Sequence, residues 1–217
     1  HYGNQAAKAS VLESKEKLQT DYLDQVLLHP PFGYYYGAYR ALEDLYIQGR
    51  VRAIGVSNFY PDRLVDLASF AHIRPMVNQV EIHPYHQQAE AKTWMEKYSV
   101  QAEAWAPFGE GRGGLFTDPV LLEIGRRYGK SAAQVVLRWH LQRGVVVIPK
   151  STHVERMREN FDVFDFALSD ADMTAIAALD KEKSAFFSHQ DPNMVEWFVR
   201  MVEERSSKGS AAAESQS

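Results

Sequence analysis

The tripeptide at positions 150–152, Lys-Ser-Thr, directly precedes a stretch with helical periodicity. Thr152 and Glu155 have the three-residue spacing of a capping box, which predicts that a helix begins here. The first turn of a helix offers unpaired backbone N–H groups and the positive end of the helix dipole, and Lys150 and Arg156 add charge beside it. We therefore predict an anion site at this helix terminus. The alternative is an ordinary capped surface helix with hydrated basic side chains.

Polar and aromatic side chains also stand where other apolar runs end. A neutral imidazole at His29 could donate a hydrogen bond to a carbonyl oxygen or exchange a proton with it, or it could simply be a packed histidine. Ser57, Asn58 and Gln79 include amides whose paired donors and acceptors suit recognition of another amide, although each could equally cap a strand end. Trp105 could stack on a heteroaromatic ring, and the alternative is a core tryptophan.

Two histidines, His83 and His86, suggest a metal site, but no third ligand is evident and zinc sites need three or four. We therefore predict no metal. By the alternation of side chains along a strand, Glu81 lies on the same face as Gln79, and Glu103 faces the same way. Buried carboxylates in such positions need partners, and the sequence does not identify them.

These candidate residues belong to a repeating pattern of strand-forming runs separated by helix-like stretches. The runs cover residues 23–29, 52–58, 77–83, 101–105 and 145–151. Helices are predicted over residues 6–19, 38–48, 61–70, 89–98, 119–128, 131–142, 154–161, 170–179 and 193–204. Strands that alternate with helices predict a parallel α/β sheet covered by helices, with its chemistry at the carboxyl ends of the strands.

Two segments fall outside this pattern. The glycine-rich stretch from Phe108 to Pro119 is predicted to be irregular, either as a mobile clasp over a site or as an ordinary long loop. Residues 206–217 are small, polar and low in complexity, so we predict a disordered tail after a domain that spans residues 1–205.

Composition limits the classes of protein to consider. The chain has 217 residues, 45% of them hydrophobic, which suits one domain with a sizeable core. A formal charge of −4 with interspersed signs argues against nucleic acid as a partner. The chain has no cysteine, which fits a reducing compartment, and no apolar run approaches the roughly twenty residues that span a bilayer. We expect a soluble, cytoplasmic protein.

Four segments, residues 21–29, 49–59, 77–84 and 148–151, resemble the aldo-keto reductase family in order and spacing, within a match from about Ala6 to Phe198. The resemblance implies a (β/α)8 TIM barrel that binds NADP(H) and passes hydride between the nicotinamide and an aldehyde or ketone. It implies that His29 is the catalytic histidine. It also implies cofactor contacts from Ser57, Asn58 and Gln79 to the carboxamide, Trp105 to the nicotinamide ring, Lys150, Ser151 and Arg156 to the 2′-phosphate, and Glu159 and Asn160 to the adenine.

A complete barrel of this type has eight strands, whereas the pattern predicts five. The family's other catalytic residues, an aspartate, a tyrosine and a lysine, would belong to strands ahead of residue 1. We therefore expect impaired activity, and self-association through exposed sheet edges. The first alternative is a non-catalytic nucleotide-binding or regulatory member of the family, and a barrel isomerase or lyase that binds a sugar phosphate is a more remote one.

The resemblance also extends to the surroundings of the substrate. Residues 34–36, three tyrosines after His29, would line the mouth of the substrate site. The segment from Lys181 to Trp197 resembles the variable loop that covers the substrate in this family. The identity of the carbonyl substrate is not predictable from these loops.

Overall fold

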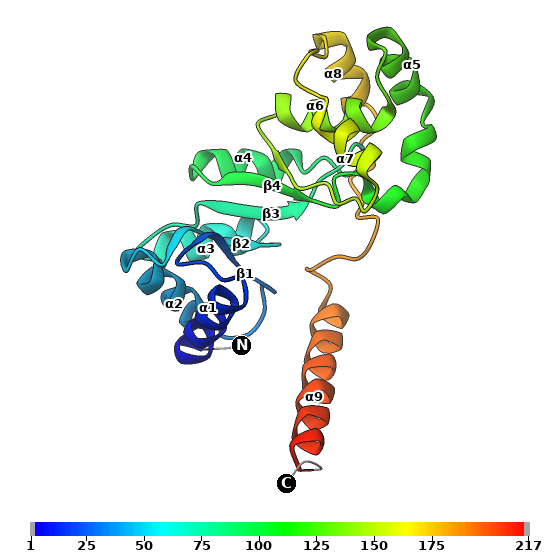
Figure 1. The fold of residues 1–217 in the computed structure, drawn as a ribbon. Helices are drawn as coiled ribbons and strands as arrows, with labels where there is room; N and C mark the ends of the chain where they lie inside the picture. The colour runs from blue at the N-terminus through cyan, green and yellow to red at the C-terminus, as the bar shows by residue number, and fades with distance from the viewer. Residues whose placement is uncertain (1–2, 215–217) are drawn as a thin grey trace. The chain divides into compact units, whose positions relative to one another are not determined.

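Five parallel strands form one sheet, whose order follows the order of the chain, β1-β2-β3-β4-β5 (Figure 1). The computed structural model describes residues 3–214. The strands are β1 (Leu23–Leu28), β2 (Val51–Ser57), β3 (Val77–Glu81), β4 (Gln101–Trp105) and β5 (Val146–Val147). Each is joined to the next by a crossover, so all five carboxyl ends lie along the same edge of the sheet.

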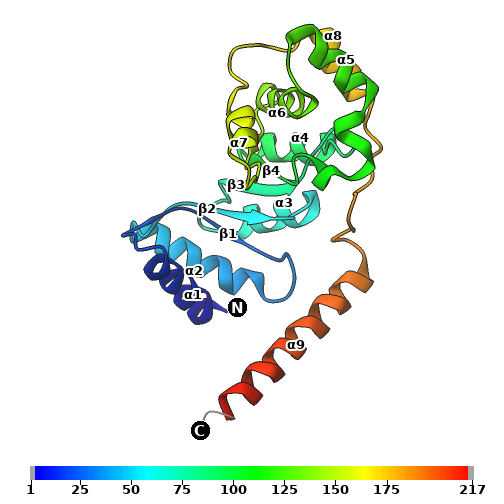
Figure 2. The same ribbon diagram turned by 45° about the vertical axis from the view of Figure 1, so that its right-hand side comes forward.

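Helices occupy the crossovers and the remainder of the chain. They are α1 (Asn4–Lys17), α2 (Tyr35–Ile47), α3 (Pro61–Phe70), α4 (Ala89–Lys97), the 3-10 segment η1 (Gly109–Thr117), α5 (Pro119–Tyr128), α6 (Ala132–Gln142), α7 (Val154–Phe161), α8 (Asp170–Ala177) and α9 (Pro192–Glu214). Helices α1 and α2 pack against each other (Figure 1, Figure 2). Among the residues described, no helix combines the length and apolar character that a membrane crossing requires.

The chain divides into two compact units, which we call the sheet unit, up to Ala185, and the C-terminal unit, from Phe186. The sheet unit contains all five strands and helices α1 to α8. The C-terminal unit contains α9 and pairs of aromatic rings, including Phe187 with Phe198 and Trp197 with Phe198.

The sheet has two chemically different faces, because side chains alternate along each strand. One face is mostly apolar and buried under helices, with Ile54, Val80 and Ala104 fully buried. The opposite face carries polar residues, and there Gly55 pairs in register with Val77. A Cβ at Gly55 would lie 2.4 Å from the Val77 carbonyl oxygen, so the close approach of these two strands requires glycine.

The predicted pattern of elements is confirmed. Every expected strand and helix is present, and the bounds of α3, α5 and α7 match the predicted ones. The fifth strand is shorter than the predicted run 145–151, in accord with Pro149, which has no N–H to donate to a ladder. The glycine-rich stretch forms the 3-10 segment η1 rather than wholly irregular structure, and Gly111, Gly113 and Gly114 have positive φ there. Helix α9 extends to Glu214, into the predicted tail, whose last three residues lie outside the described part.

Two predictions about helix caps had different outcomes. Ser131 forms the expected N-cap of α6, with a complete capping box to Gln134. The capping box predicted for Thr152 and Glu155 is wrong, because the N-cap of α7 is His153 and no side chain caps that helix. Ser151 instead accepts the N–H of His153 through its Oγ at 3.1 Å, so the turn before α7 leaves Thr152 outside the cap position.

Candidate functional site

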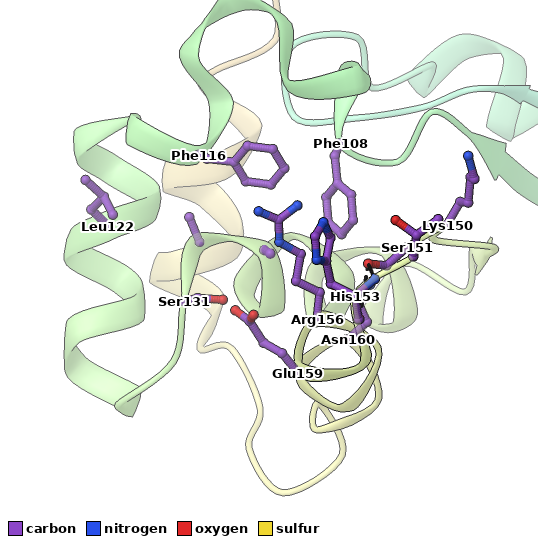
Figure 3. Close-up of a pocket in the computed structure, with 13 residues that line it drawn as sticks. Phe108, Phe116, Leu122, Ser131, Lys150, Ser151, His153, Arg156, Glu159 and Asn160 are labelled. Carbon is purple, nitrogen blue, oxygen red and sulfur yellow. Dashed lines mark hydrogen bonds between the residues drawn. The ribbon is translucent and has the colours of Figure 1, made fainter.

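A cavity of about 660 Å³ opens beside the amino end of α7 (Figure 3). Its lining residues are Phe108, Phe116, Leu122, Ser131, Ala132, Ala133, Lys150, Ser151, Thr152, His153, Arg156, Glu159 and Asn160. All five residues that the sequence predicted to hold the adenosine end of a nucleotide belong to this set. A volume of several hundred cubic ångströms is in the range of sites for small organic ligands.

The wall of the cavity opposite α7 is apolar. Phe108 follows β4 and Phe116 lies in η1, and their rings are 5.4 Å apart between centroids. Leu122 of α5 and the first residues of α6 continue this wall. The positive φ angles of Gly113 and Gly114 reverse the chain before Phe116, conformations that glycine adopts without steric cost.

The α7 wall carries the charge. Lys150 and Arg156 are exposed at the cavity, and Figure 3 shows the Arg156 guanidinium below the Phe116 ring and beside the Phe108 ring. Glu159 and Asn160, one turn further along α7, are partly buried and offer a carboxylate and an amide. This donor set fits a ligand with an anionic group near the cations and a flat, hydrogen-bonding ring against the apolar wall.

A second cluster lies at the carboxyl ends of β2, β3 and β4. Trp105 donates its Nε1–H to Asn58 Oδ1 at 2.8 Å, Asn58 donates its Nδ2–H to Ser57 Oγ at 3.3 Å, and Ser57 donates its hydroxyl to the Gln79 carbonyl oxygen at 3.1 Å. Asn58 adopts φ of +59°, a left-handed conformation that asparagine tolerates better than most residues. The structure therefore brings four of the predicted cofactor residues into one hydrogen-bonded chain.

The partners of the buried carboxylate Glu103 also become clear. It accepts hydrogen bonds from Gln79 Nε2 at 2.5 Å and from Gln25 Nε2 at 3.1 Å, on the polar face of the sheet. Because the Gln79 Nε2 is committed to Glu103, Gln79 presents its Oε1 acceptor to any ligand on this face.

His29 lies one residue beyond the Leu28–Val56 pair, which places it level with Ser57 at the same edge of the sheet. The residue as a whole is exposed, yet protein atoms around the imidazole displace water and lower the pKa of His29. A neutral imidazole at neutral pH can donate a hydrogen bond without carrying charge. Tyr35 and Tyr36 donate their hydroxyls to Asp66 Oδ2, at 3.1 and 2.6 Å, and their place at the mouth of the substrate site stays a prediction.

The two histidines considered for metal binding have other partners. His83 contacts Glu81, and His86 Nε2 lies 2.9 Å from the Gln88 side-chain nitrogen. In the part of the chain that the structure describes, no group of three or more potential metal ligands occurs.

Sequence reasoning missed the apolar wall of the cavity. Phe108, Phe116 and Leu122 are separated from α7 by more than 25 residues, and no local periodicity connects them to it. The one available signal in the sequence is the glycine-rich segment, which the sequence predicts to be either a clasp or a loop. The structure places that segment at the cavity through Phe116.

Comparison with known proteins agrees with this geometry. A model of the aldo/keto reductase family matches residues 1–181. A glyoxal reductase of Bacillus subtilis is 47% identical over 182 residues, which are 83% of this chain and 65% of that protein. The methylglyoxal reductase DkgA of Escherichia coli K12 is 39% identical over 179 residues, 81% of this chain and 65% of that protein. The chain thus spans about 65% of the length of these curated relatives.

Solved structures give the same assignment. An aldo-keto reductase from a Medee basin deep-sea metagenome library superposes with a TM-score of 0.85 at 37% identity, covering 87% of this chain and 71% of that one. A Bombyx mori aldo-keto reductase in complex with NADP gives a TM-score of 0.81 at 30% identity, covering 86% and 66%. The five parallel strands correspond to part of the TIM barrel of these enzymes. With its sequence and its fold matched along most of its length, this chain belongs to the aldo/keto reductase family.

Proposed function

We propose that this chain binds NADP(H) and serves hydride transfer between the nicotinamide and an aldehyde or ketone. The observation that carries the proposal is that one cavity is lined by all five of the residues Lys150, Ser151, Arg156, Glu159 and Asn160. The relatives support it, since two of them are named as glyoxal and methylglyoxal reductases and one solved neighbour is a complex with NADP.

The cavity would hold the adenosine half of the cofactor. Lys150 and Arg156 would bind the 2′-phosphate, assisted by Ser151, because a phosphate ester favours neighbouring cations and hydroxyl donors. Glu159 and Asn160 would hydrogen-bond the adenine, and Phe108 and Phe116 would cover its apolar surface.

The strand-end cluster would hold the nicotinamide half. Trp105 would stack against the ring, while Ser57, Asn58 and Gln79 would recognise the carboxamide. The hydrogen bond from Trp105 to Asn58 orients both side chains before any ligand arrives, which reduces the entropy lost on binding. When bound, NADPH supplies the hydride.

His29 would orient the carbonyl of the substrate. Its depressed pKa keeps the imidazole neutral, so that it can donate a hydrogen bond to the carbonyl oxygen. The family's tyrosine, aspartate and lysine are not assigned to residues of this chain. Small dicarbonyls such as methylglyoxal are the first substrates to test, given the activities for which the relatives are named.

The test compares the affinities of NADPH and NADH, measured by calorimetry. We expect the parent chain to prefer NADPH, and Arg156→Ala to lose about tenfold in NADPH affinity with little change for NADH, because a hydrogen bond to a charged group is worth roughly 1.5–3 kcal/mol. Arg158→Ala is the matched control, since Arg158 lies on the same helix but lines a different surface depression. Equal affinities for the two cofactors in the parent would refute the proposal.

A second measurement separates binding from turnover. NADPH oxidation in the presence of methylglyoxal tests for reduction, and His29→Ala should lower its rate without changing the affinity for NADPH. NADPH binding with no oxidation would favour a nucleotide-binding role without catalysis.

A further inference from the structure

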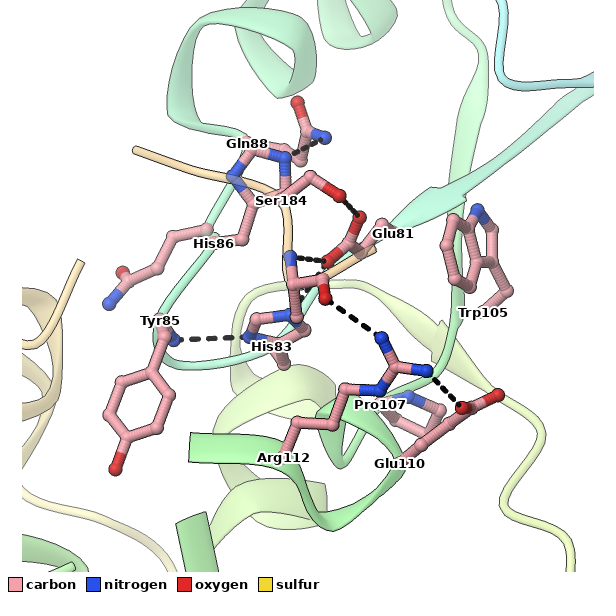
Figure 4. A network of polar contacts seen from close by, with 12 residues as sticks. Glu81, His83, Tyr85, His86, Gln88, Trp105, Pro107, Glu110, Arg112 and Ser184 are labelled. Atoms are coloured by element: carbon pink, nitrogen blue, oxygen red, sulfur yellow. Dashed lines mark hydrogen bonds and ion pairs between the residues drawn. The ribbon is translucent and has the colours of Figure 1, made fainter. Parts of the chain in front are cut away.

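Glu81, the last residue of β3, is almost fully buried at 1% exposure and accepts three hydrogen bonds (Figure 4). The donors are His83 Nε2 at 2.9 Å, Ser184 Oγ at 2.6 Å and the backbone N–H of Ala185 at 2.8 Å. His83 Nδ1 accepts the N–H of Tyr85 at 3.3 Å, so the ring proton must be on Nε2 and His83 donates to Glu81. Both carboxylate oxygens are therefore committed, two of the three bonds going to residues more than 100 positions away.

The same stretch of chain is held from its other side. Arg112 of η1 donates from Nη1 to the Ala185 carbonyl oxygen at 3.0 Å, and its Nη2 lies 3.6 Å from Glu110. The N–H of Lys181 donates to the Tyr85 carbonyl oxygen at 3.0 Å. Ala185 is thus clamped at both ends of its backbone, by a carboxylate from β3 and by a guanidinium from η1.

The clamp lies next to the proposed nicotinamide site. Glu81 pairs in register with Trp105, and the two side chains are neighbours on the polar face of the sheet. Ala185 is the last residue of the sheet unit, and the chain continues from it into the C-terminal unit. The segment η1, which supplies Arg112, also supplies Phe116 to the wall of the nucleotide cavity.

Burial removes water from a carboxylate, which lowers the stability of the protein unless hydrogen bonds to the charged group compensate for the lost hydration. Burial by itself would raise the pKa of Glu81, but the hydrogen bonds from His83, Ser184 and Ala185 outweigh burial and lower it. The group is therefore ionised at neutral pH, and hydrogen bonds to an ionised acceptor are about twice as strong as neutral ones. This arrangement resists displacement of residues 184 and 185 more strongly than neutral contacts would.

We propose that Glu81 and Arg112 are positioning residues that clamp the Ala185 peptide, fix the segment 181–185 beside Trp105, and thereby determine which carbonyl substrates reach the nicotinamide. The statement about substrates rests on the function proposed above. The clamp itself does not, because it is defined by contacts within the sheet unit. Neither residue touches the reacting atoms, and both act through the position of the chain at Ala185.

The clamp is tested by digestion of the full chain with a lysine-specific protease. Lys183 is exposed next to the clamp, so the bond between Lys183 and Ser184 should be cleaved slowly while the clamp is closed. We expect Ser184→Ala and Arg112→Ala each to accelerate this cleavage about tenfold or more, because each removes a hydrogen bond to or from a charged group. Ser184→Thr keeps the hydroxyl and should restore the slow rate. Ser188→Ala is the matched control, since that hydroxyl accepts a hydrogen bond from Gln190 within the C-terminal unit.

Cleavage after Lys92, which lies inside α4, requires that helix to open and so reports unfolding of the rest of the sheet unit in the same digest. A rate that rises after Lys183 and not after Lys92 supports the clamp. Equal cleavage after Lys183 in the parent, Ser184→Ala and Arg112→Ala would overturn it, as would failure of Ser184→Thr to differ from Ser184→Ala.

The second measurement is the kinetics of carbonyl reduction. In a catalytically active protein, Ser184→Ala should raise KM for the carbonyl severalfold while leaving the affinity for NADPH unchanged. An unchanged KM overturns the assignment to substrate selection. If the chain neither binds NADPH nor turns over, the proposed function fails, whereas the protease experiment still decides whether the clamp exists.

Discussion

Replacement of His140 should make the stability of this protein less sensitive to acid. His140 of α6 is completely buried, with its Nε2 3.4 Å from the Pro107 carbonyl oxygen and its Nδ1 without a hydrogen-bond partner. The pKa of His140 is lowered to about 3, mainly by burial; the nearby Arg143 and His83 act in the same direction, and the hydrogen bond to the Pro107 carbonyl opposes them. The folded protein therefore holds this imidazole neutral.

The magnitude follows from the difference between the two states. In the unfolded chain the histidine titrates near its ordinary value of 6.5, so acid protonates the unfolded state first. The stability that depends on a neutral His140 is fully present above that pH and is lost as the pH falls from 6.5 towards 3. Between about pH 7 and about pH 4.5 the loss is about 2.5 kcal/mol, at roughly 1.36 kcal/mol for each unit of pH below the unfolded pKa.

The assay is urea unfolding of the parent and of His140→Gln at these two pH values. The variant should lose about 2.5 kcal/mol less than the parent on acidification, whatever its stability at neutral pH, because Gln does not titrate. His72→Gln, which replaces an exposed histidine, should retain the acid sensitivity of the parent. The reasoning would be refuted if parent and His140→Gln lost the same free energy of unfolding.

Three further changes test the fold and the site. A change from glycine to alanine within a helix is ordinarily stabilising, but Gly125→Ala should lower the midpoint of thermal unfolding. The reason is that a Cβ at position 125 would lie 2.3 Å from the Lys130 carbonyl oxygen. An unchanged or higher midpoint would contradict this close contact. Trp105→Ala should weaken NADPH binding by roughly tenfold, since the stacking of an aromatic side chain on a base is worth about 1–3 kcal/mol. If calorimetry gives the variant the same NADPH affinity as the parent, Trp105 does not belong to the proposed site. We also predict that the chain self-associates through β5, an end strand of the sheet in which Val146 is exposed and which the exposed Ile148 directly follows. Sedimentation should show less association for Val146→Lys, and a monomeric parent would refute the prediction.

Local features of the fold were predictable because a few neighbouring residues encode them. Pro61 and Pro119 occupy the first turns of α3 and α5, and Ser131 caps α6. The prediction failed where neighbouring turns compete. Thr152 has cap-like spacing, but Ser151 Oγ accepts the N–H of His153 in the turn before α7, and His153 rather than Thr152 occupies the N-cap position.

The sequence indicated which residues to consider for the candidate site, but it did not indicate which distant residues contact them. The alternation of side chains along parallel strands identified the polar face, and family resemblance supplied the roles of Lys150, Arg156 and Trp105, which remain predictions. Nothing in the local sequence connects Phe116 to α7, or explains how the carboxylate of Glu103 is satisfied.

The sequence by itself determined that parallel strands alternate with helices and that polar residues gather at the carboxyl ends of the strands, because hydrophobic periodicity and turn residues act over one or two turns of chain. Only the tertiary structure decided the partners across the sheet. Gln25 reaches Glu103 over 78 positions, and Ser184 reaches Glu81 over 103. Such contacts depend on strand register and on the path of distant loops, and a buried carboxylate takes whichever donors that packing brings within hydrogen-bond distance.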